Sequence, residues 1–145
     1  MNPVVYEGVV TQSGTMDDGH TYSAEQTIRL EIHPGQAVQG QIIRTENKKF
    51  VDGSALLSTG LPLYLNRYLL YYGACRECVR GFVVEGLMCL ETIGSPERLK
   101  PSDAHWSPHS YYLVIDHDTL SGIAINRDDP ADRTNDVGHV FARKV

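Results

Sequence analysis

The chain has 145 residues, three cysteines and a formal net charge of −5. Its length suits one domain, over residues 1–145, that buries a hydrophobic core without metal or disulfide support. The negative charge argues against duplex nucleic acid as a partner, because a binder needs basic side chains to displace counterions from phosphates.

The same features bear on the compartment. Three cysteines at irregular spacing do not form the disulfide framework of a small secreted domain. The opening MNPVVYEGVV has neither the basic nor the apolar region of a signal peptide. No apolar run approaches the roughly 18–20 residues that cross a bilayer. We therefore expect a soluble, intracellular, cytoplasmic protein with no membrane partner.

The clearest strand signal is Thr27–His33, in which Ile28, Leu30 and Ile32 alternate with polar residues. This period of two predicts a half-buried antiparallel strand. In the first half of the chain, further strands are expected at Pro3–Thr11, Ala37–Glu46 and Phe50–Ser58, with turns at 12–23 and 47–49.

The central part of the chain reads in two pieces. Cys78–Thr92 is rich in β-branched and aromatic residues, which predicts one long bent strand or two short strands that meet near Gly86. Leu61–Tyr72 is ambiguous. It reads as a strand or as a short helix over 62–72, since Pro62 near the start and a glycine after the end are typical of helices.

A long polar segment, Ile93–Ser110, separates this region from three C-terminal strands. These strands are expected at Tyr111–Asp116, Leu120–Asn126 and Val137–Val145. The total is eight or nine strands joined mostly by hairpin turns. This pattern predicts a mainly β, single-domain, antiparallel up-and-down β-barrel, because closure removes exposed strand edges. A β-sandwich is the alternative.

The segments 6–8, 30–32 and 38–41, together with the ending 137–145, resemble the opening and closing strands of avidin- and lipocalin-like (calycin) barrels. The resemblance concerns topology. It implies a small molecule held inside the barrel. It does not extend to biotin, because avidins use several tryptophans at that site and this chain has only Trp106.

The favoured function is non-catalytic binding of a small organic ligand in an aromatic-lined lumen or mouth. Aromatic side chains with polar tips supply contact area and orienting hydrogen bonds. Trp106, in the long segment, is expected to cover the mouth. The candidate ligand-binding residues are Tyr64, Tyr68, Tyr72, Arg80, Trp106 and Tyr111. Polar residues on predicted strands that can also face inward are Gln39, Gln41, Arg44, Arg67, Arg80, Asn126 and His139.

Two other classes stay open. One is a cofactor-free cyclase, isomerase or lyase acting on a hydrophobic substrate, with acid–base residues among Tyr68, Arg80, His109 and Asp116. The other is a protein-interaction module without a pocket. A second copy of the chain is a further candidate partner, which would give a homodimer. The catalytic residues are unknown.

No cofactor is expected, and no metal. The residues that would hold a zinc ion, were one bound, are the Cys75/Cys78 pair with His105 and His109. The spacing between the two pairs is not that of a zinc finger.

Overall fold

The computed structural model describes residues 3–15, 21–33, 35, 37–52, 67–71, 74–94, 96–99, 108–126 and 137–145. These form ten β-strands in one sheet, and no helix occurs among them. The strands are β1 (Val4–Thr15), β2 (Thr21–His33), β3 (Ala37–Asp52), β4 (Arg67–Tyr71), β5 (Cys75–Val84), β6 (Leu87–Thr92), β7 (Glu97–Arg98), β8 (His109–Asp116), β9 (Thr119–Asn126) and β10 (Gly138–Lys144).

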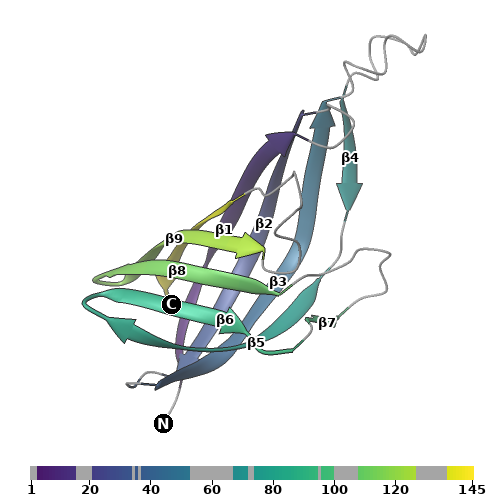
Figure 1. The fold of residues 1–145 in the computed structure, drawn as a ribbon. Helices are drawn as coiled ribbons and strands as arrows, with labels where there is room; N and C mark the ends of the chain where they lie inside the picture. Colours follow the sequence, from purple (N-terminus) through teal and green to yellow (C-terminus); the bar gives the residue numbers. More distant parts are fainter. Residues whose placement is uncertain are drawn as a thin grey trace, which may run out of the picture.

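The sheet closes on itself as an antiparallel up-and-down barrel of eight strands, as the sequence predicted (Figure 1). The order around the barrel is β1-β2-β3-β5-β6-β8-β9-β10, with β10 paired to β1. The contact of β3 with β5 completes the ring. The two remaining strands, β4 and β7, pair with the end of β3 and the start of β5.

Alternation along each strand decides which side chains enter the barrel. On β2 the inward residues are Ile28, Leu30 and Ile32, as the period of two predicted, and all three are buried. The lumen is filled by an apolar cluster, to which the largest contributors are Tyr6, Ile28, Leu30, Ile32, Val38, Ile42, Val79, Met88, Leu90, Tyr111, Leu113, Leu120 and Val140. Each buried aliphatic side chain contributes about 1.5–3 kcal/mol of transfer free energy, so this cluster is the main source of stability.

Two glycines meet local backbone requirements, one for a close approach between strands and one for a tight turn. An added Cβ at Gly81 would lie 1.7 Å from the carbonyl oxygen of Cys89 on the neighbouring strand, so only glycine permits that approach. Gly86 has a φ of 80° and follows Glu85 at 51°, which is the type I′ geometry of a two-residue hairpin. Cys78–Thr92 is therefore two strands that meet at Gly86, one of the two predicted arrangements.

Three local predictions were wrong. The turn expected at 12–23 is strand at both ends, because β1 continues to Thr15 and pairs with β2 from Thr21 onward. The short helix considered for 62–72 is replaced over Arg67–Tyr71 by strand β4, and 62–66 lie outside the described residues. The turn expected at 47–49 is strand instead, because β3 continues to Asp52 and pairs with an extended β2. The polar residues there accompany a β-bulge, in which Glu25–Thr27 of β2 opposes one extra residue of β3.

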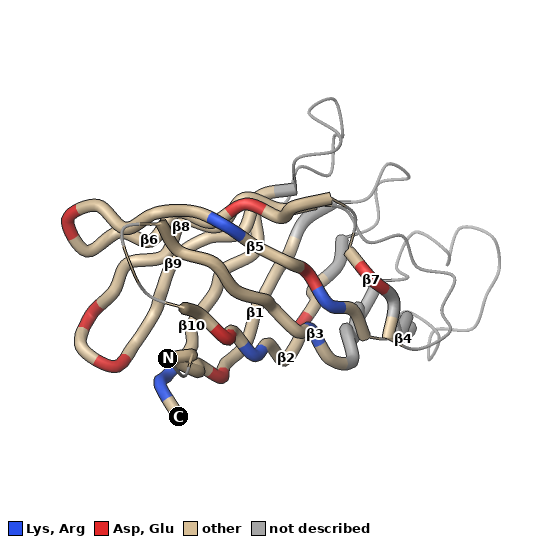
Figure 2. The backbone as a smooth tube through the Cα atoms, turned by 90° about the horizontal axis from the view of Figure 1, so that it is seen from below, with Lys and Arg blue, Asp and Glu red and all other residues tan. Residues whose placement is uncertain are grey.

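The barrel has two distinct ends. At one end β1, β2 and β3 extend beyond the ring, and β4 pairs with the extension of β3 (Figure 1). The chain termini lie near each other at the other end, together with the β8–β9 turn (Figure 2). Within the described residues, no helix has the length and apolarity needed to cross a membrane.

Candidate functional site: a buried polar cluster in the barrel

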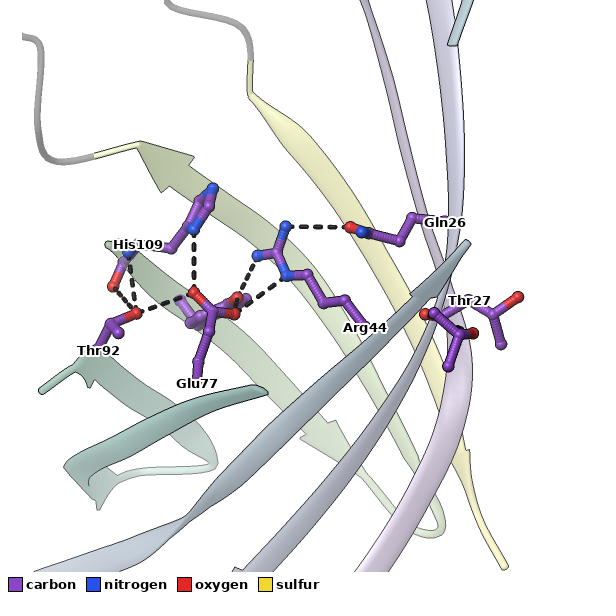
Figure 3. A network of polar contacts seen from close by, with 8 residues as sticks. Gln26, Thr27, Arg44, Glu77, Thr92 and His109 are labelled. Atoms are coloured by element: carbon purple, nitrogen blue, oxygen red, sulfur yellow. Dashed lines mark hydrogen bonds and ion pairs between the residues drawn. The ribbon is translucent and has the colours of Figure 1, made fainter. Parts of the chain in front are cut away.

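Six polar side chains meet inside the barrel toward the end at which β1–β3 extend. We call this group the polar cluster; its members are Gln26, Arg44, Glu77, Thr92, His109 and Tyr111 (Figure 3). They come from five strands: β2, β3, β5, β6 and β8. Each occupies an inward position, so closure of the ring brings together residues that are as much as 85 positions apart (Gln26 to Tyr111, by their sequence numbers).

Glu77 lies at the centre of the polar cluster. Its Oε2 accepts a hydrogen bond from Arg44 Nε at 3.0 Å and another from the Tyr111 hydroxyl. Its Oε1 accepts from the Thr92 hydroxyl and lies 3.1 Å from His109 Nδ1. Figure 3 shows the carboxylate between His109 on one side and Arg44 on the other. Both oxygens are thus fully used, which suits an ionised carboxylate.

The charge states follow from burial and neighbours. Burial alone would raise the pKa of Glu77, but Arg44, His109 and Tyr111 outweigh it and lower that pKa from 4.5 to about 2. Burial and the Glu77 charge hold the pKa of Tyr111 well above 10, against the opposing effect of Arg44. At neutral pH the cluster therefore contains an ionised Glu77, a charged Arg44 and a neutral Tyr111.

Arg44 holds the cluster to the β2 side of the barrel. Burial would lower its pKa, but Tyr111 and Glu77 raise it instead, so the guanidinium stays charged. It donates to Tyr111 and, through Nη1 at 3.1 Å, to the side-chain oxygen of Gln26. Because arginine only donates, this bond fixes which end of the Gln26 amide is oxygen. The guanidinium also stacks 5.5 Å from the centre of the Tyr111 ring.

His109 lies where the polar cluster reaches solvent. Its side chain is 16% exposed, whereas that of Glu77 is 1% exposed. An ionised carboxylate can only accept a hydrogen bond, so the proton of the His109–Glu77 contact belongs on Nδ1. In neutral His109 the lone pair is then on Nε2. The backbone N–H of His109 donates to Thr92 Oγ1 at 2.9 Å, which fixes the start of β8 against the end of β6.

The ligand-binding residues predicted from the sequence lie in different parts of the structure. Tyr111 is in the polar cluster, and its ring is completely buried. Arg80 lies on the outer surface in an exposed ion pair with Glu91, because the inward positions of β5 are Cys75, Glu77 and Val79. It therefore does not line the lumen. The residues Tyr64, Tyr72, His105 and Trp106 lie outside the described part of the chain, as does the side chain of Tyr68.

Of the acid–base candidates with described side chains, only His109 is in the cluster; Asp116 is exposed where β8 ends, at the opposite end of the barrel. Of the polar residues considered as inward-facing, Arg44 is buried inside. Gln39, Gln41, Arg80 and His139 lie on outward positions by strand alternation. Sequence reasoning did not single out Gln26, Glu77 or Thr92. The inward position of Glu77 could have been inferred from Val79, because residues two apart on a strand face the same side.

The two cysteines of the CxxC pair point to opposite sides of β5. Cys75 is buried inside the barrel and Cys78 is exposed outside. All three cysteines are free thiols. Across the described residues, no group of three His, Cys, Asp or Glu side chains is arranged to hold a metal ion.

This arrangement predicts unequal thiol reactivity. Burial raises the pKa of Cys75 to about 12, with a further increase from Glu77 and an opposing effect of Arg44. At pH 8 Cys75 is therefore almost entirely in the thiol form, and the thiolate is the reactive form. Mass mapping after brief iodoacetamide treatment should find Cys78 labelled and Cys75 unlabelled until denaturant is added. Equal labelling of both thiols in the folded protein would contradict the inward position of Cys75.

No family model matches the chain, and it has no significant match to a curated protein or to a solved structure. Its class therefore rests on the fold and the site: a mainly β, closed antiparallel barrel with an ionised polar cluster inside it. This topology is consistent with that of calycin-like barrels.

Proposed function

We propose that the protein binds a small organic ligand, without catalysis, at the end of the barrel where the polar cluster reaches solvent. His109 is the orienting polar contact of this proposed site. Glu77 contacts its Nδ1, and Arg44 and Tyr111 in turn hold Glu77. We also propose that the protein is related to calycin-like barrels, which the topology and the terminal strand motifs support. The observation that carries it is a buried ion-paired network ending in a partly exposed histidine.

The energetic cost of the polar cluster supports a functional role. Taking Arg44 and Glu77 out of water costs several kcal/mol for each ion, and well-packed apolar residues are often as stable in such positions. Apolar side chains fill the rest of the lumen. A buried Gln26 Nε2 that has no hydrogen-bond partner among the described residues adds to the cost. Expensive polar groups at one end of an apolar lumen are typical of ligand sites.

Chemical-shift mapping tests this proposal even while the ligand is unidentified. A library of small carboxylic acids, amides and phenols would be screened against ¹⁵N-labelled protein. We expect binders to shift the backbone amides of Gln26, Glu77 and His109 most. Binders that shift only outer-surface amides, or no binders at all, would contradict a site at this end.

The histidine itself gives a sharper prediction. His109→Ala should raise the Kd of such a binder roughly 5- to 30-fold, the effect of losing about 1–2 kcal/mol of one oriented hydrogen bond. The matched control is His33→Ala, since His33 is exposed at the opposite end of β2. An equal loss in both variants, or none in His109→Ala, would remove His109 from the site.

A second candidate function rests on the Glu77–His109 contact. A carboxylate bound to Nδ1 orients an imidazole and increases the basicity of Nε2, as in general acid–base centres. On this basis we also propose a cofactor-free isomerase, cyclase or lyase that moves a proton through His109 Nε2. The two candidates separate when an identified binder is incubated with the protein: conversion by wild type but not by His109→Ala indicates the enzyme, and an unchanged ligand indicates the binding protein.

A further inference from the structure

One side of the barrel presents an uncharged, largely apolar outer surface. Strand pairing places its residues in two neighbouring rows across β5, β6, β8, β9 and β10. One row is Phe82, Cys89, Tyr112 and Ile123, and it ends on β10 at His139; the other is Val84, Leu87, Val114, Ser121 and Phe141. We call the nine residues other than His139 the apolar face. Phe82 and Val114 are each 51% exposed and Tyr112 is 42% exposed, which is unusual for such large side chains.

The opposite side of the barrel has a different character. There Arg29 pairs with Glu7 at 2.5 Å and lies 3.7 Å from Glu31, which also accepts from Gln41. Figure 2 shows the contrast: β8 and β9 carry no Lys, Arg, Asp or Glu along their length until the turn at Asp116, whereas β1–β3 carry both signs. Five of the exposed large apolar side chains are thus gathered on one side of the barrel: Phe82, Val84, Tyr112, Val114 and Phe141.

A groove opens at one edge of the apolar face. It encloses about 440 Å³, and among its lining residues are Phe82, Cys89 and Tyr112. Arg80 and Glu91 form its charged rim, in an ion pair with Nε and Oε1 3.1 Å apart. The rim therefore carries one charge of each sign beside a groove whose walls include two aromatic side chains.

We propose that the apolar face is the interface of a homodimer, with a second copy of this chain as its occupant. In a two-fold dimer each residue meets the same surface on the partner, so a patch must be self-complementary. The apolar face meets that condition: its centre is uncharged, and its rim has Arg80 next to Glu91, so either can face the opposite charge of the other copy. At the β10 edge the guanidinium of Arg143 lies 5.6 Å from the centre of the Phe141 ring, so a cation borders the face there as well. Phe82 and Tyr112 also line the groove, so in a two-fold dimer the aromatic rings of one copy meet the groove of the other.

Charge favours a second copy over an unlike partner. The chain has a net charge of −5, so two copies repel each other wherever their charged surfaces meet. The uncharged side is where this repulsion is smallest. A strongly basic or acidic partner, by contrast, finds no complementary potential there. Closure of the barrel also removes strand edges as a route of association for the eight barrel strands, which leaves their outer faces.

The size of the apolar face indicates a weak dimer. Five strands about 4.8 Å apart with rows about 7 Å apart give a patch of roughly 300–400 Å². A standard interface buries about 800 Å² per partner, so the patch supplies its apolar centre and the rim supplies the rest. We therefore expect a Kd on the order of micromolar to tens of micromolar.

Sedimentation velocity across a dilution series tests the dimer. Wild type should sediment as a dimer at about 200 µM and dissociate on dilution. Val114→Glu places a charge in the centre of the face and should raise the Kd at least tenfold. Thr27→Glu adds the same charge on exposed β2, on the other side of the barrel, and should leave the Kd unchanged. A monomer at every concentration, or equal dissociation of both variants, would overturn the proposal.

A charge reversal gives a second test that does not depend on the folding of Val114→Glu. Arg80→Glu and Glu91→Arg should each weaken the dimer, and the double variant should restore it, because the exchanged charges again face opposite signs across the two-fold axis. In wild type, the amide signals of Phe82, Tyr112 and Val114 should shift with concentration. Concentration-dependent shifts confined to other surfaces would assign the dimer elsewhere. This outcome is independent of ligand binding at the end of the barrel where the polar cluster reaches solvent.

Discussion

Replacing Arg44 with methionine is expected to lower the free energy of unfolding by about 3–5 kcal/mol, because the change leaves a buried carboxylate without its cation. Glu77 is 1% exposed. Its described hydrogen-bond partners are Arg44, Thr92, His109 and Tyr111. Among these, only Arg44 is a permanent cation, since the charge of His109 depends on protonation. Tyr111 and Gln26 also lose a donor. For a domain of this size the melting temperature should fall by roughly 10 °C.

Two controls separate this effect from a general loss of charge. Arg29→Met removes an ion pair in which both side chains are about half exposed, and such pairs are worth roughly 0–1 kcal/mol. Arg44→Met combined with Glu77→Leu removes both buried ions, so the double variant should be more stable than the sum of its single changes predicts. An additive double variant, or equal losses at Arg29 and Arg44, would show that the ion pair does not organise the lumen.

The fold could be predicted because its signals are local. Alternation at Ile28, Leu30 and Ile32 and the hairpin residues of the C-terminal half specify antiparallel strands, and closure follows from the need to remove strand edges. Boundaries were less accurate. The polar run at 47–49 reads as a turn, yet pairing with β2 and a bulge keep it in the strand. Leu is a good helix former, but pairing with β3 places Arg67–Tyr71 in a strand.

The polar cluster was harder to predict because it depends on three-dimensional closure. A glutamate in a strand is normally exposed, so nothing local marks Glu77 as buried. Only its alternation with Val79 indicates an inward position, and that argument needs the inner face of β5 to be known. Arg44 and Arg80 look alike in the sequence, and yet Arg44 is inside and Arg80 outside. The pairing of Arg44 with Glu77, 33 residues away, follows from the contact of β3 with β5.

Loss of stability in acid is the second large effect expected of the polar cluster. The pKa of Glu77 falls from 4.5 to about 2 on folding, because Arg44, His109 and Tyr111 outweigh the effect of burial. A depressed pKa means that the folded state binds the proton less tightly than the unfolded state. The associated stability is therefore complete above pH 4.5 and is lost as the pH falls toward 2. The full difference corresponds to about 3 kcal/mol, of which about 2 kcal/mol is lost by pH 3.

Urea unfolding at pH 6 and pH 3, for wild type and for Glu77→Gln, measures this contribution. Other carboxylates also titrate in this range, so the difference between the two proteins isolates Glu77. Wild type should lose about 2 kcal/mol more than the glutamine variant between the two pH values, although the variant starts less stable because Arg44 has lost its counter-ion. Should Glu77→Gln not fold, ¹³C titration of the Glu77 carboxyl in wild type gives the answer directly. A midpoint near 4.5 would mean that Arg44 and its neighbours do not hold Glu77 ionised, and the electrostatic basis of the proposed site would fail with it.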